Sequence, residues 1–155
     1  MKQKTVWITC GPPGSGKSTW CEEQVKENGG VHCSRDAIRF SLLEEGDSYF
    51  AHEVEVLRQW KTQIANAIAN PEVRDVYVDA THLNERARKI IIDTLPKGDY
   101  KTMFVFFETD LLVCLERNEV REGRSRVPDE IIRNMYLSYQ KYTAYGDGYI
   151  VIKGE

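Results

Sequence analysis

The chain has 155 residues, of which 41% are hydrophobic and 29% are charged, and its formal net charge is −3. This length predicts one domain with a single hydrophobic core, and the composition is typical of an ordinary soluble globular protein. The small negative charge excludes a protein that attracts nucleic acid over its whole surface, although a local basic groove would not show in the total. No apolar stretch approaches the roughly 20 residues that a membrane-spanning helix needs.

The first residues and the cysteines indicate an intracellular protein. The start, MKQKTVWITC, has two lysines but too short an apolar run for a signal peptide, so we expect a cytoplasmic location. Cys10, Cys21, Cys33 and Cys114 are scattered and contain no C-x-x-C pair. We interpret them as reduced, mostly buried thiols, and as neither a disulfide framework nor a zinc site.

Short apolar runs alternate with helical patterns along the chain. Strands are predicted over residues 5–10, 31–33, 76–80, 102–107 and 148–152. Helices are predicted over residues 16–30, 34–45, 47–70, 84–95, 110–120 and 127–142. On the third of these, the predicted core face consists of Phe50, Val54, Leu57, Ile64 and Ile68. Strands separated by helices predict a parallel sheet covered on both faces, in one three-layer α/β domain spanning residues 1–155.

A glycine-rich loop, GPPGSGKST, follows the first predicted strand at residues 11–19. It contains the pattern G-x-x-x-x-G-K-S, whose backbone N–H groups turn inward at a helix N-terminus and hold an anion. We expect Lys17 to reach the β- and γ-phosphates of ATP or another nucleoside triphosphate, and the Ser18 hydroxyl to ligate Mg²⁺. The predicted phosphate-binding residues are Gly14, Ser15, Gly16, Lys17, Ser18 and Thr19.

The segment SRDAIR, residues 34–39, lies just past the second predicted strand. In an open α/β sheet this position is at the carboxyl edge, facing the phosphate loop. Asp36 is placed there to accept a proton from a hydroxyl that attacks the γ-phosphorus, with Arg35 and Arg39 beside it. The alternative is a helix cap at Ser34 or Asp36, with both arginines solvated.

The segment VYVDATHLN, residues 76–84, ends a buried strand with a carboxylate. A buried carboxylate is costly unless it meets a donor, Mg²⁺ or a water on the metal, so we expect Asp79 to join Ser18 at the metal, through water. Thr81 and His82 lie at the same edge. Asp79 is alternatively a cap of the helix that opens near Asn84, and for His82 a hydrogen-bonded structural role is favoured over catalysis.

The segment ERNEVREGRSRVP, residues 116–128, carries four arginines around a glycine. A mobile arginine segment can bring positive charge onto reacting phosphates and exclude water, so it predicts a lid over the nucleotide. We assign Arg117 and Arg121, one helical turn apart, to the nucleotide, and leave the roles of Arg124 and Arg126 open. A solvated polar turn is the alternative.

Four segments resemble, in their order and spacing, the phage-type 5′ polynucleotide kinase domain of the P-loop kinase superfamily. They are GPPGSGKSTW, SRDAIR, VYVDATHLNERAR and LERNEVREGRSRVPDEIIRNMY. The resemblance covers most of the chain. It implies a P-loop NTPase-type fold with a central, mainly parallel five-stranded sheet, and transfer of the γ-phosphoryl of ATP to a 5′-hydroxyl end of DNA or RNA. Lys17 and Ser18 would then bind the phosphates and magnesium.

The same resemblance implies roles on the acceptor side. Asp36 would be the general base, Arg39 would contact the phosphate next to the acceptor hydroxyl, and Arg121 would be the lid residue on the triphosphate. Arg35 and Thr81 complete the expected acceptor side. A separate phosphatase or ligase is an expected partner, and the host cytoplasm is the expected location if a phage encodes the protein.

Two other functions fit parts of the sequence. The same scaffold phosphorylates nucleosides, nucleotides, sugars and other small hydroxyl acceptors. The third predicted helix favours this, because Arg58 and Lys61 are offset by Glu53 and Glu55, which leaves no cationic stripe for nucleic acid. A nucleotide-dependent switch is the other alternative, and Asp36 separates it from a kinase, because a switch needs no proton acceptor aimed at a hydroxyl.

Overall fold

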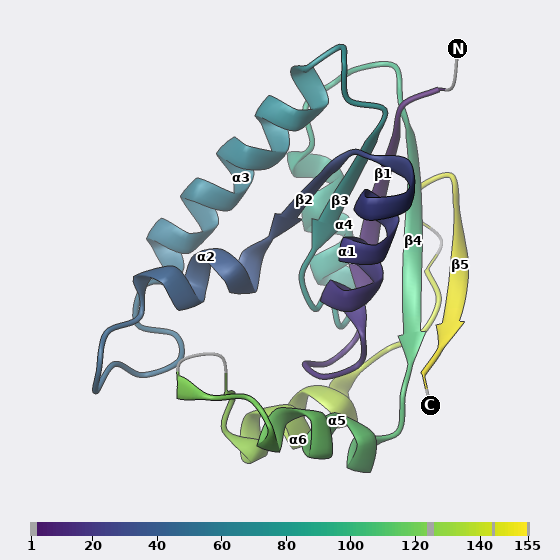
Figure 1. The fold of residues 1–155 in the computed structure, drawn as a ribbon. Helices are drawn as coiled ribbons and strands as arrows, with labels where there is room; N and C mark the ends of the chain where they lie inside the picture. The colour runs from purple at the N-terminus through teal and green to yellow at the C-terminus, as the bar shows by residue number, and fades with distance from the viewer. Residues whose placement is uncertain (1–2, 124–125, 144, 155) are drawn as a thin grey trace.

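The predicted parallel sheet is present in the computed structural model, which describes residues 3–123, 126–143 and 145–154. Its five strands run in the order β2-β3-β1-β4-β5, and every neighbouring pair is parallel. Figure 1 shows α1 in front of the sheet and α4 behind it, with α5 and α6 below. The strands are β1 (Thr5–Cys10), β2 (Val31–Ser34), β3 (Asp75–Asp79), β4 (Lys101–Glu108) and β5 (Gly148–Lys153).

All six predicted helices are present, with shifted ends. They are α1 (Lys17–Asn28), α2 (Arg35–Leu42), α3 (Glu53–Ala69), α4 (Glu85–Thr94), α5 (Leu111–Glu119) and α6 (Asp129–Ser138). Side chains alternate across the sheet. On one face Val6, Ile8 and Val78 pack against α3 and α4. On the other, Trp7 and Tyr77 stack with ring centroids 6.5 Å apart beneath Trp20 of α1. The three-layer prediction is confirmed.

The predicted core face of the third helix is wrong at its beginning. Residues 48–52 form turns, α3 starts at Glu53, and Phe50 and Val54 are 49% and 88% exposed. The reason is Trp60, whose indole N–H donates to the carbonyl of Cys33 at 2.9 Å and fixes the buried side of the helix. The buried face of α3 consists of Val56, Trp60, Ile64, Ala67 and Ile68.

The four cysteines are buried free thiols, as the sequence predicts. Within the described part of the chain, no helix combines the length and the apolar character needed to cross a membrane. The carboxyl ends of the strands and the helices that follow them meet at one edge of the sheet. The segments singled out in the sequence lie at this edge.

Candidate active site

The glycine-rich loop connects β1 to α1 and has the backbone conformation that its glycines predict. Gly14 and Gly16 have φ angles of 82° and 104°, in the left-handed region. A Cβ on Gly14 would lie 2.6 Å from the carbonyl oxygen of Cys114, so this position requires glycine. Lys17 is buried, and its ammonium donates to the carbonyl of Pro12 at 2.8 Å. Burial lowers the pKa of Lys17, while the nearby carboxylates of Asp79 and Asp36 favour its charged form.

Asp79 lies at the end of β3, 3% exposed, and faces the first turn of α1. Its Oδ2 accepts from the Ser18 hydroxyl at 2.9 Å and lies 2.7 Å from Nε2 of His32, while Thr9 donates to Oδ1 at 3.1 Å. Burial alone would raise the pKa of Asp79, but the His32 hydrogen bond and the Lys17 charge lower it. A hydroxyl and a carboxylate beside the phosphate loop are the oxygen ligands that Mg²⁺ prefers, so the two residues fit this ion.

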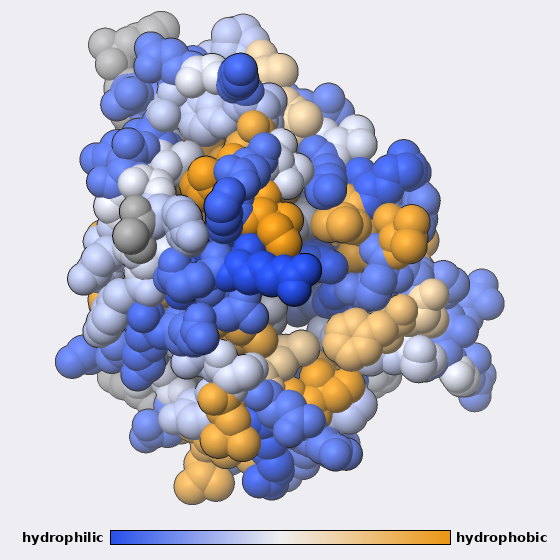
Figure 2. All heavy atoms as spheres, turned by 180° about the vertical axis from the view of Figure 1, so that it is seen from behind, coloured by the Kyte–Doolittle hydropathy of each residue, from blue (hydrophilic) through white to orange (hydrophobic). Residues whose placement is uncertain are grey.

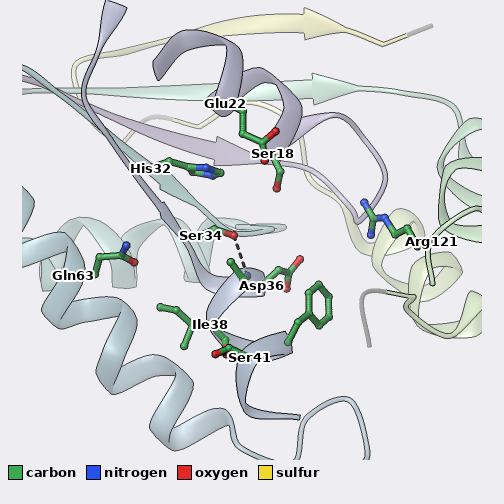
Figure 3. Close-up of a pocket in the computed structure, with 11 residues that line it drawn as sticks. Ser18, Glu22, His32, Ser34, Asp36, Ile38, Ser41, Gln63 and Arg121 are labelled. Carbon is green, nitrogen blue, oxygen red and sulfur yellow. Dashed lines mark hydrogen bonds between the residues drawn. The ribbon is translucent and has the colours of Figure 1, made fainter. Parts of the chain in front are cut away.

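Asp36 is free of the capping role that the sequence left open for it. The side chain of Ser34 caps α2 by accepting from the backbone N–H of Ala37 at 3.1 Å (Figure 3). The Asp36 carboxylate instead accepts from Arg39, and from the Tyr49 hydroxyl at 3.2 Å. Both donors bind Oδ1. The carboxylate is thus oriented by two side chains while its own side chain stays 29% exposed.

Arg39 is 6% exposed and is held by Glu53, a partner that the sequence analysis did not find. Its Nη2 and Nε donate to the two carboxylate oxygens of Glu53 at 2.7 and 2.9 Å, and Nη1 donates to Tyr49 at 3.0 Å. Arg35 also donates to Glu53, at 3.2 Å, and its guanidinium lies 5.5 Å from the centre of the Trp60 ring. The substrate contacts expected of both arginines stay predictions, since these atoms meet protein partners here.

The segment after β3 packs against the phosphate loop. The backbone N–H of Gly11 donates to the carbonyl of Thr81 at 2.8 Å, which places Thr81 beside this loop. His82 is 6% exposed, and its Nδ1 lies 2.7 Å from the carbonyl oxygen of Thr9, so Nδ1 carries the proton and donates. This is the structural role that the sequence favours. The helix that follows is capped by Asn84, which accepts from Ala87, and not by Asp79.

His82 predicts a pH dependence of stability. Burial lowers its pKa to about 4, so between about pH 6.5 and pH 4 the unfolded chain binds a proton that the folded chain does not. The free energy of unfolding should therefore fall by about 3 kcal/mol as pH falls through this window. Asp79, with its lowered pKa, loses its contribution only at lower pH. Urea unfolding of the protein and of His82→Asn at pH 7, 5.5 and 4.5 tests this. If the free energy of unfolding fell equally with pH in both proteins, His82 would not be the cause.

Two arginines of the predicted lid reach the phosphate loop from α5 and its C-terminal end. The Nη1 of Arg117 donates to the carbonyl of Gly14 at 3.0 Å. Arg121 follows α5, and its backbone N–H donates to the carbonyl of Asn118 at 3.1 Å. Arg124 lies outside the described residues, and Arg126 is exposed. Arg117 and Arg121 both line the pocket that contains the phosphate-loop residues, and their contact with a nucleotide stays a prediction.

The two ends of the segment predicted as a lid are joined by Asn118, whose role the sequence analysis missed. This side chain is fully buried; its Nδ2 donates to the carbonyl of Val127 at 2.6 Å, and its Oδ1 accepts from the Val127 N–H at 2.9 Å. Nδ2 also lies 3.2 Å from a carboxylate oxygen of Asp129. One amide thus joins both ends of the segment that carries Arg121. An R-N pair followed nine residues later by V-P is the pattern that could have indicated it.

Replacing Asn118 by Ala leaves the buried N–H and carbonyl of Val127 without their partner. Because each unpaired buried polar group costs about 1–3 kcal/mol, we expect the free energy of unfolding to fall by at least about 2 kcal/mol. Urea denaturation measures this. Asn134→Ala, an exposed position on α6, is the matched control and should change stability by less than about 0.5 kcal/mol. A loss no larger than that of the control would show that the amide does not hold the lid.

Two pockets meet at this site. One, of about 600 Å³, lies over the phosphate loop and is lined by residues 13–20, Asp36, Arg117 and Arg121, among others. The other, of about 440 Å³, is lined by Ser18, His32, Ser34, Asp36, Gln63 and Arg121, among others. Figure 3 shows Asp36 and Arg121 on opposite sides of the second pocket. Seen from behind, the molecule is also hollowed above its lower part, which carries α5 and α6 (Figure 2). Ser18, Asp36 and Arg121 line both pockets.

The parallel sheet and the phosphate loop define a P-loop kinase-type α/β fold. A family model described as an AAA domain matches residues 6–142, and the chain belongs to this family. A sugar kinase from Janibacter sp. HTCC2649 has a TM-score of 0.65 and 20% identity, covering 97% of this chain and 85% of that one. A chain of the Pnkp1/Rnl/Hen1 RNA repair complex has a TM-score of 0.70 and 18% identity, covering 89% and 44%. A fungal RNA kinase has a TM-score of 0.65 and 14% identity, covering 99% and 39%.

This chain therefore spans less than half the length of the two RNA-related chains and most of the sugar kinase. At these identities the similarity shows the fold alone. The choice of acceptor has to be argued from the residues of the site.

Proposed function

We propose that this protein is an ATP-dependent kinase that transfers the γ-phosphoryl group to a hydroxyl acceptor, and that the acceptor is the 5′-hydroxyl end of a polynucleotide. The observation that carries the first part is the position of Asp36. Its carboxylate lines both the pocket over the phosphate loop and the neighbouring pocket, together with Ser18 and Arg121. A proton acceptor between a phosphate site and a second pocket suits transfer to a hydroxyl, and a switch has no use for it.

Each of these side chains has a separate role in the proposed reaction. Arg39 and Tyr49 hold Oδ1 of Asp36, and we assign the proton of the acceptor hydroxyl to Oδ2. The acceptor oxygen then forms its bond to the γ-phosphorus while the bond from that phosphorus to the bridging oxygen breaks, and ADP leaves. Lys17 and Arg121 supply positive charge to the phosphates as charge develops. Ser18, and Asp79 through water, would hold magnesium, which would supply further positive charge to the phosphates.

The polynucleotide acceptor is supported by the order and spacing of the four sequence segments. The presence of an RNA kinase and an RNA repair complex among similar structures is compatible with it. A sugar acceptor is the second candidate. It is favoured by the second pocket, where the short polar side chains Ser34 and Ser41 and the amide of Gln63 offer hydrogen bonds. Among the described residues that line this pocket, Arg121 is the one arginine.

Transfer from γ-labelled ATP with Mg²⁺ tests the proposal. The acceptors are a 5′-hydroxyl oligonucleotide, the same oligonucleotide already 5′-phosphorylated, a nucleoside mixture and a panel of sugars. Label on the 5′-hydroxyl oligonucleotide alone supports the whole proposal. Label on sugars or nucleosides keeps the kinase and replaces the acceptor. Slow hydrolysis with no labelled acceptor in any arm overturns the kinase itself.

A further inference from the structure

Three metal-ligating side chains meet behind the phosphate loop, from three separate elements. Cys21 comes from α1, His32 from β2 and Asp79 from β3, and their ligand atoms all lie within 4.8 Å of one another. The pair His32 Nε2 and Asp79 Oδ2 is already at 2.7 Å. Spacing along the chain gives no zinc motif, because Cys21 and Asp79 are 58 residues apart and only the parallel sheet brings them together.

We propose that Cys21, His32 and Asp79 form a binding site for a thiophilic divalent cation such as Zn²⁺. Thiolate, imidazole and carboxylate are the ligands that Zn²⁺ takes, usually in a tetrahedron, whereas Mg²⁺ prefers oxygen alone. Bond lengths of about 2.0–2.3 Å put tetrahedral ligand atoms about 3.3–3.7 Å apart. The ligand atoms that lie furthest apart, within 4.8 Å of one another, need to close by about 1 Å, and His32 Nε2 and Asp79 Oδ2, now 2.7 Å apart, need to separate by about 0.6 Å. Rotation of the side-chain torsions supplies both movements.

The surroundings of the three ligands suit a cation that enters and leaves. His32 lines the 440 Å³ pocket next to Ser18 and is 18% exposed, which gives an entry path and room for a water as the fourth ligand (Figure 3). Thr9 donates to the other oxygen of Asp79 at 3.1 Å and keeps Oδ2 turned toward His32. Such outer partners are what orients ligands in zinc sites.

Binding requires a defined movement of protons. The Cys21 thiol loses its proton to solvent. His32 Nε2, which donates to Asp79 Oδ2 in the unliganded site, must also give up its proton, and the ring then binds through Nε2 with a proton on Nδ1. Thiolate and carboxylate then give the ligands a charge of −2, which balances the charge of the divalent cation. Burial raises the pKa of the Cys21 thiol, so the unliganded site holds a neutral thiol.

Occupation of the site has a consequence for magnesium, and this consequence rests on the proposed function. The Oδ2 atom that Zn²⁺ would take is the same atom that accepts from Ser18 at 2.9 Å. A cation bound there removes Asp79 from the magnesium site beside the phosphate loop. We therefore expect Zn²⁺ to weaken binding of Mg²⁺–ATP in competition with Mg²⁺.

Cobalt(II) binding to the protein without nucleotide tests the site directly. A thiolate–cobalt charge-transfer band in the near ultraviolet is expected for the natural chain and for Cys33→Ala. That control removes a buried thiol one residue from His32, on the other side of β2. Cys21→Ala should lose the band, and both Cys21→Ala and His32→Gln should bind Zn²⁺ at least about tenfold more weakly in chelator competition.

The outcomes separate this site from the kinase. A cobalt band that survives in Cys21→Ala, or a Zn²⁺ affinity unchanged in both variants, overturns the site whatever the acceptor assay shows. Thermal unfolding of each variant shows whether it is folded; if Cys21→Ala is not, Cys21→Ser takes its place. Titration of Mg²⁺–ATP binding at fixed Zn²⁺ then tests the competition, and an ATP affinity that Zn²⁺ leaves unchanged overturns the link to magnesium alone.

Discussion

Replacing Asp36 by Asn is expected to lower kcat for phosphoryl transfer by about 10²–10⁴-fold, the usual contribution of a general base. The amide is close in shape to the carboxylate and keeps an oxygen for the bonds that Arg39 and Tyr49 donate. What it lacks is the basic oxygen that takes the proton of the acceptor in the proposed reaction. ATP binding, measured by calorimetry without acceptor, should change by less than about threefold, because Lys17 and the phosphate-loop backbone remain in place.

Asp93→Asn is the matched control for this substitution. Asp93 lies on α4, where its exposed carboxylate pairs with Lys89 at 2.7 Å. The same change of charge there should leave kcat and ATP affinity unaltered. If Asp36→Asn lowered ATP affinity and transfer by the same factor, the carboxylate would act by holding the site together through Arg39, and the assignment of a general base would be wrong.

Local patterns were enough to predict the fold. Alternating strands and helices, the glycine loop and the stops at Gly29 and Pro71 gave five strands and six helices in the right order. Phe50 was misplaced because the apolar pattern extended the helix back to residue 47, whereas α3 starts at Glu53. Val54 was misplaced because apolar spacing alone cannot choose between two faces of an amphipathic helix. The hydrogen bond from Trp60 to Cys33 makes that choice, and its partner lies 27 residues away in the chain.

The partners of the site residues were not predictable in the same way. Glu53 looks like a solvated acid at a helix start, yet it binds both Arg35 and Arg39. Arg88 stands in a charged run, ERARK, but it is fully buried. Its guanidinium donates to the carbonyl of His82 at 2.9 Å and lies 4.8 Å from the centre of the Phe106 ring. These contacts depend on loops that only the folded chain brings together.

Arg121 lies in the segment whose ends Asn118 joins, and its replacement by Ala is expected to lower kcat by about 10²–10³-fold. The guanidinium lines both pockets, at the boundary where the γ-phosphoryl would pass from donor to acceptor. Positive charge at that boundary interacts more strongly with the transferring group than with bound ATP, so the loss should appear mainly in kcat and only weakly in ATP affinity. Single-turnover transfer and ATP calorimetry measure the two separately.

Arg126→Ala provides the comparison, because it removes an exposed arginine from the same predicted lid. Arg126 lines a different pocket, together with Glu44 and Asp47. It should reduce kcat by less than about threefold. If Arg121→Ala lowered ATP affinity and kcat/KM by the same factor and left kcat unchanged, Arg121 would act in binding ATP before the reaction. A loss confined to kcat would instead mean that the charge of Arg121 acts as the phosphoryl group moves.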